Sequence, residues 1–127
     1  MVLSKKINPL LLLILFISCD YPDRDCKDYH TGNFYTETTE NNKTYKTTFS
    51  RKHNGIQIEE YEGKIDSSRV RWVNDCEMVL TPINPKKLTD KKNILIKILT
   101  TTDSSYTYEY SFLGFSQKLK AEAVRIK

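Results

Sequence analysis

The chain has 127 residues, of which 28% are charged and 11% are aromatic, and its formal net charge is +4. This length suffices for one domain with a single core, and four Gly and four Pro are too few for a fibrous or a disordered chain. Positive and negative charges nearly balance, so the composition gives no electrostatic reason to expect a nucleic-acid partner.

The first 19 residues have the pattern of an export signal. Lys5 and Lys6 precede an unbroken apolar run at 10–17, which is too short to cross about 30 Å of hydrocarbon as a helix. Residues 16–19, Phe-Ile-Ser-Cys, resemble the lipobox of bacterial lipoproteins, which implies cleavage before Cys19 and its acylation. The alternative is an ordinary signal peptide with a chance cysteine. The lipobox predicts a protein of the bacterial cell envelope, held in the outer membrane by the lipid on Cys19.

Three segments follow from this prediction. They are a lipoprotein signal peptide at 1–18, the lipidated cysteine with an acidic tether at 19–25, and a single domain at 26–127. Of the 127 residues, 109 remain after removal of 1–18, and the loss of two lysines lowers the net charge from +4 to +2. Asp20, Asp23 and Asp25 of the tether form either a simple spacer or a signal that resembles the surface-export signals of Bacteroidota lipoproteins.

The cysteine count suggests a disulfide. If Cys19 carries lipid, Cys26 and Cys76 remain as a pair in an extracytoplasmic compartment, where disulfides persist. A bridge between them would close a loop of about 50 residues and contribute roughly 4 kcal/mol in the chain-entropy model. Two buried free thiols are the alternative, and we predict the disulfide.

The remainder of the chain contains short alternating runs typical of strands. Tyrosine, phenylalanine and threonine are abundant, and these residues favour sheets. The expected strands are 33–37, 43–51, 56–61, 69–73, 76–81, 94–100, 106–112 and 119–126. The last run fits a helix or a strand, and we predict a strand because its neighbours offer a sheet to join.

The Asn54-Gly55 pair is the clearest turn signal, since Asn-Gly between strand-forming runs favours a two-residue hairpin. Such a turn would place Ile56 and Ile58 on the same face as Phe49.

These elements predict an all-β fold, an antiparallel meander of seven or eight short strands. No βαβ pattern occurs, and a strongly curved sheet or a small lipocalin-like barrel would hide the sheet edges. Whether the sheet closes is left open by the sequence. Four bulky residues would then fill the interior of a small barrel, namely Trp72, Tyr108, Tyr110 and Phe112.

Three clusters resemble the motifs of one protein group. They are residues 26–34, Arg51 with Gln57 and Glu59, and residues 72–81. The group consists of small Bacteroidota lipoproteins with a Cys-x-x-aromatic-x-x-Gly-x-Phe opening, an Arg…Gln-x-Glu hairpin and a Trp-x-x-Asp-Cys-x-x-x-Leu-Thr strand. Met78 departs from the tyrosine usual in the group. The resemblance implies a shared fold and envelope address. It implies no activity, and the topoisomerase IV label of some members does not suit a small exported chain.

No catalytic or cofactor motif is present in the sequence. It has two histidines without a Cys/His cluster at zinc spacing, and no Gly-x-Ser-x-Gly, P-loop or dinucleotide fingerprint. We therefore expect no enzyme, no cofactor and no metal site.

Arg51, Gln57 and Glu59 are the candidate binding residues. They could line the mouth of a cavity and bind a polar head group, or form a cross-strand pair on a solvated face. The second reading is favoured.

The sequence therefore ranks two functions. A non-catalytic interaction or accessory module, with another envelope protein as partner, comes first because bulky side chains would fill the interior. Lipocalin-like binding of a small apolar or amphipathic ligand is the alternative.

Overall fold

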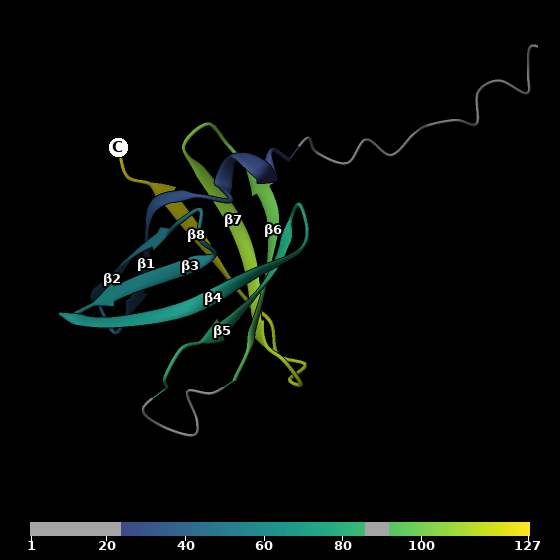
Figure 1. Cartoon of the computed structure of the whole chain (residues 1–127). Helices are drawn as coiled ribbons and strands as arrows, with labels where there is room; N and C mark the ends of the chain where they lie inside the picture. The colour runs from purple at the N-terminus through teal and green to yellow at the C-terminus, as the bar shows by residue number, and fades with distance from the viewer. Residues whose placement is uncertain (1–23, 86–91) are drawn as a thin grey trace, which may run out of the picture.

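Eight strands follow one another in chain order and form a closed antiparallel barrel in the computed structural model, which describes residues 24–85 and 92–127 (Figure 1). The strands are β1 Gly32–Glu40, β2 Lys43–Arg51, β3 Ile56–Tyr61, β4 Lys64–Asn74, β5 Glu77–Pro82, β6 Ile94–Thr101, β7 Ser105–Phe112 and β8 Leu119–Arg125. A short 3-10 helix, η2, spans Cys26–Tyr29 ahead of β1. The predicted signal peptide, Cys19, Asp20 and Asp23 lie outside the described residues.

Closure of the barrel depends on the pairing of the first strand with the last. Phe34 of β1 pairs with Arg125 of β8, and Tyr35 pairs with Val124. The Ile126 amide extends this ladder by donating to the Asn33 carbonyl at 2.8 Å. The all-β prediction and the predicted final strand are confirmed, and closure removes the exposed edges of an open sheet.

The turn between β2 and β3 differs from the two-residue hairpin that Asn54-Gly55 predicted. The Lys52 amide donates to the Ile56 carbonyl at 3.0 Å, so three residues rather than two connect the strands. Gly55 has φ +80°, a backbone conformation that L side chains rarely adopt. A three-residue loop ending in such a glycine is the next most common hairpin type.

This extra residue reverses the faces of β3. Arg51 pairs with Gln57, and Phe49 pairs with Glu59. The predicted placement of Ile56 and Ile58 on the face of Phe49 is therefore wrong, because a one-residue change of register exchanges the two faces of a strand. Gln57 and Glu59 face the barrel interior in their place.

The end of the barrel next to η2 has a packed aromatic core. Tyr29 of η2 is fully buried, and its ring centre lies 6.0 Å from that of Phe34 and 5.0 Å from that of Tyr106. Phe34 also packs against Phe49 at 5.3 Å. Helix η2 thus closes this end of the barrel.

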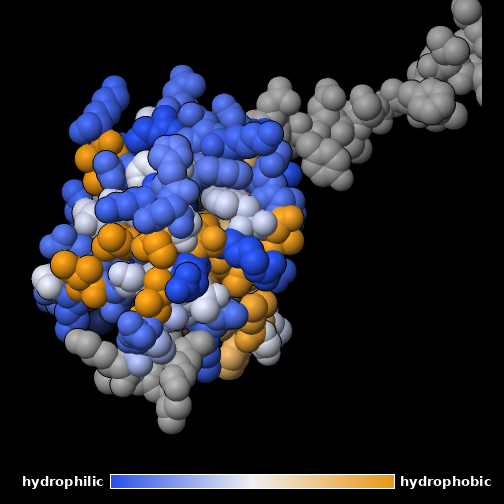
Figure 2. All heavy atoms as spheres, viewed as in Figure 1, coloured by the Kyte–Doolittle hydropathy of each residue, from blue (hydrophilic) through white to orange (hydrophobic). Residues whose placement is uncertain are grey.

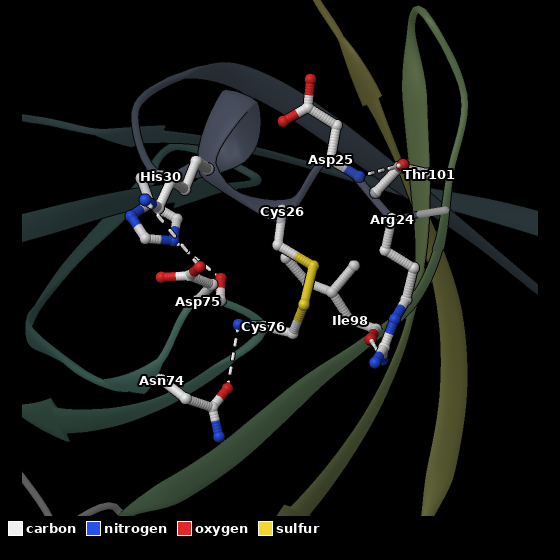
Figure 3. The surroundings of a disulfide bond; sticks show 10 residues. Arg24, Asp25, Cys26, His30, Asn74, Asp75, Cys76, Ile98 and Thr101 are labelled. Carbon is white, nitrogen blue, oxygen red and sulfur yellow. Dashed lines mark hydrogen bonds and ion pairs between the residues drawn. A yellow bond between two sulfur atoms is a disulfide. The ribbon is translucent and has the colours of Figure 1, made fainter. Parts of the chain in front are cut away.

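The predicted disulfide is confirmed and holds η2 in this position. Cys26 and Cys76 are bonded with a Cα–Cα distance of 5.2 Å, which joins η2 to the turn between β4 and β5 (Figure 3). Hydrogen bonds surround the bridge. Arg24 donates to the Ile98 carbonyl at 2.9 Å, and the His30 ring contacts the Asp75 carbonyl at 2.8 Å.

The outer surface mixes polar and apolar groups. Figure 2 shows a mostly hydrophilic face with a broken band of hydrophobic residues across its middle. Phe112 is 43% exposed, so the prediction that it helps to fill the interior is wrong. It lies at the last position of β7, where the strand leaves the barrel. In residues 24–85 and 92–127, no helix has the length and apolar character needed to cross a membrane.

Candidate functional site: the barrel cavity

A cavity of about 260 Å³ occupies the barrel between its middle and the end away from η2. It is bordered by inward-facing side chains of all strands except β4: Thr36, Thr38, Thr47, Phe49, Arg51, Gln57, Glu59, Leu80, Ile94, Ile96, Tyr106, Tyr108, Tyr110 and Ala121. The period of two along each strand explains this set, because every second residue points inward. The bulky residues predicted to fill the interior leave this space open, so the interior is only partly packed.

Arg51 forms the polar floor of the cavity. Its side chain is buried, with 3% of the residue exposed. Nη2 donates to the Tyr29 carbonyl at 2.7 Å and to the Tyr106 hydroxyl at 3.0 Å. Nη1 donates to Gln57 Oε1 at 3.0 Å and contacts the Met78 sulfur at 3.6 Å. The guanidinium thus links η2, β3, β5 and β7 at the centre of the barrel.

Aromatic rings surround the same guanidinium. Its carbon lies between 5.2 and 5.7 Å from four ring centres, those of Phe34, Phe49, Trp72 and Tyr106. The faces of aromatic rings attract cations, and this attraction is strongest where water is excluded. The rings therefore help to stabilise a buried positive charge that has no carboxylate in direct contact among the described residues.

Gln57 connects this cation to a carboxylate. Its amide oxygen accepts from Arg51, and its Nε2 donates to Glu59 Oε1 at 2.8 Å. Burial raises the pKa of the Glu59 carboxyl, and the hydrogen bond from Gln57 opposes part of that rise. Glu59 is half-buried and borders the cavity. The arrangement is a chain of polar groups that runs from the floor to the cavity wall.

The prediction that Arg51, Gln57 and Glu59 form a cross-strand pair on a solvated face is therefore wrong about the solvent exposure of these residues. Arg51 and Gln57 do pair across β2 and β3, but both lie in the interior, with 3% and 2% exposed. The physical reason is the three-residue turn, which directs Gln57 and Glu59 inward. The other reading of these residues, as groups that border a cavity, agrees with their placement.

Tyrosines of β7 form one wall. The ring centres of Tyr106 and Tyr108 are 5.5 Å apart, and those of Tyr108 and Tyr110 are 5.8 Å apart. Burial raises the pKa of the Tyr108 phenol to about 12, so this group stays neutral at ordinary pH. Thr36 of β1 borders the same cavity, and its hydroxyl, close to that of Tyr108, opposes part of this rise. The aromatic alternation of 106–112 signalled this wall, whereas nothing in the sequence singled out Thr36.

The pKa of Glu59 predicts a pH-dependent stability. A carboxyl whose pKa is raised by folding binds its proton more tightly in the folded state, so stability falls as pH rises through the folded pKa. The loss begins above the ordinary Glu value of 4.5 and is complete above the folded pKa. Urea denaturation from pH 4 to 8 should therefore show a decline in the wild type that Glu59→Gln lacks. Glu60→Gln, at an exposed neighbouring position, should keep the decline. Parallel curves for wild type and Glu59→Gln would contradict this expectation.

Among residues 24–85 and 92–127, no group of three or more His, Cys, Asp or Glu side chains could hold a metal ion. Comparison of the chain with protein-family models, with curated proteins and with solved structures found no match.

Proposed function

We propose that the domain binds a small amphipathic molecule inside the barrel. The observation that carries this proposal is the cavity of about 260 Å³, whose lining combines aliphatic and aromatic side chains with threonines and with the polar groups of Arg51, Gln57 and Glu59. Ligand sites commonly combine an apolar lining with a few convergent polar groups. We rank ligand binding above an interaction module. The sequence favoured the interaction module only because bulky side chains were expected to fill the interior.

The size of the cavity limits the ligand. Its volume corresponds to about nine water molecules at roughly 30 Å³ each, which is just below the usual range for drug-sized ligands. A whole phospholipid would exceed this volume. The ligand is therefore a compact molecule, with its apolar part against Leu80, Ile96 and the tyrosine wall.

Filling the cavity tests this proposal. Ala121 borders the cavity and is the register partner of Tyr108 on the neighbouring strand, so Ala121→Phe should place a ring in the ligand space. Native mass spectrometry of the protein purified from its own cells should show a bound small molecule in the wild type and none in this variant. Glu122→Phe is the matched control, because residue 122 is exposed and faces the opposite side of β8. Absence of any small molecule from the wild type, or its retention in Ala121→Phe, would contradict the proposal.

An exposed apolar cluster supports a second function, as an interaction module for another envelope protein. Phe112, Leu113, Phe115 and Leu119 are each between 43% and 54% exposed around the connection from β7 to β8. The rings of Phe112 and Phe115 are paired at 6.3 Å. Exposed apolar groups that gather at one place commonly mark interaction sites. A co-purifying protein that Phe115→Asp releases, with no small molecule bound, would favour this second function.

We also propose that the domain is anchored to the bacterial cell envelope through lipid on Cys19. The support is the lipobox-like pattern of residues 16–19. The disulfide agrees with this address, since such bonds persist outside the cytoplasm.

A Cys19→Ser variant tests the address. We expect globomycin, which blocks lipoprotein signal cleavage, to leave an unprocessed precursor of the wild type. Cys19→Ser should leave the membrane fraction, because one serine cannot carry the thioether-linked lipid. Cys19→Ser protein that still sediments with membranes after a carbonate wash would show that the lipid anchor is not what holds the chain.

A further inference from the structure

We propose that the cavity recognises a compact primary amine, whose ammonium group donates hydrogen bonds to Glu59 and lies against the tyrosine wall. This inference rests on the proposed ligand binding in the barrel and specifies the chemistry of the ligand. It follows from which polar atoms of the site are already occupied and which remain able to bind.

The terminal nitrogens of Arg51 already have hydrogen-bond partners within the protein. Its two terminal nitrogens contact Tyr29, Gln57, Met78 and Tyr106, and aromatic rings surround the group. Its Nε is buried and has no partner among the described residues. An anionic ligand would find a free donor at Nε alone, and it would have to displace existing hydrogen bonds to contact either terminal nitrogen.

The carboxylate of Glu59 has capacity left. An ionised carboxylate offers about four lone-pair sites, and the hydrogen bond from Gln57 uses one of them. Gln57 orients the group, because the same amide is held on its other side by Arg51. Glu59 thus presents a positioned acceptor at the cavity wall, and it would repel a ligand carboxylate.

Two further features suit an ammonium group. The successive rings of Tyr106, Tyr108 and Tyr110 border the cavity, and their faces attract cations. Thr36 Oγ1 also borders the cavity beside the Tyr108 hydroxyl, and a hydroxyl oxygen with one such neighbour keeps a lone pair as a second acceptor. An ammonium group carries three donors and no acceptor, which matches a site with free acceptors.

A matched ligand series tests this inference. Phenethylamine, 2-phenylethanol and phenylacetate share one ring and differ in a terminal ammonium, hydroxyl or carboxylate. Isothermal titration of each into the full-length protein in phospholipid nanodiscs at pH 7 gives the three affinities. We expect the amine to bind at least about tenfold more tightly than the alcohol, since hydrogen bonds to charged groups are the stronger ones. Phenylacetate should bind more weakly than both.

Variants separate this inference from the proposal on which it rests. Glu59→Gln should remove the preference for the amine over the alcohol, whereas Glu60→Gln, at an exposed position, should keep it. Equal affinities for all three probes, or tightest binding of phenylacetate, would overturn the amine inference. In those cases, loss of binding in Ala121→Phe would still support the barrel cavity as a ligand site. No binding of any probe to the wild type would count against both.

Discussion

Replacement of Arg51 by alanine is expected to lower the free energy of unfolding by roughly 3–5 kcal/mol. The side chain makes hydrogen bonds to Tyr29, Gln57 and Tyr106, and its loss leaves these buried polar groups without their donor. An alanine also leaves empty space where the guanidinium lay among the aromatic rings. An effect of this size is a large part of the stability of an ordinary small domain.

Urea denaturation of the two proteins at pH 7 measures this loss. Arg69→Ala is the matched control, because Arg69 is also a strand arginine but is exposed on β4. Its effect should stay within about 0.5 kcal/mol of the wild type. If Arg51→Ala costs less than about 1 kcal/mol, the interior network does not hold the barrel together as described.

Removal of the disulfide is expected to cost a similar amount. The bond between Cys26 and Cys76 spans a sequence separation of 50 residues. A loop of that length corresponds to about 4 kcal/mol in the chain-entropy model, and native bridges of small secreted domains commonly contribute 2–5 kcal/mol. The bond also holds η2 over the end of the barrel, so its loss frees the element that carries Tyr29.

The double variant Cys26→Ala/Cys76→Ala tests this prediction without leaving an unpaired thiol. We expect its urea midpoint to match that of the wild type measured with reductant, and reductant should have no further effect on the variant. A wild type whose midpoint does not change with reductant would show that the bridge adds nothing to stability.

The fold was largely predictable because its signals are local. Alternation along 43–51 and 106–112 predicted β2 and β7, and the cysteine count predicted the bridge between Cys26 and Cys76. Closure of the barrel was not predictable, because it depends on the pairing of β1 with β8 across most of the chain. Such long-range pairing leaves no mark in the periodicity of either strand.

The residues of the site could be predicted from the sequence, but their position inside the barrel could not. Arg51, Gln57 and Glu59 were identified, but a single additional turn residue decides whether β3 directs its isoleucines or its polar residues inward. Polar residues in the interior contradict the usual pattern, in which a strand buries its apolar face. The cavity itself depends on how side chains from seven strands pack, which no local segment encodes.

The most direct test of the central claim is a crystal structure of the protein purified from its own envelope. We expect a closed eight-stranded barrel with non-protein electron density beside Glu59 and the rings of Tyr108 and Tyr110. A barrel whose interior is filled by its own side chains, with Glu59 turned outward to solvent, would contradict it.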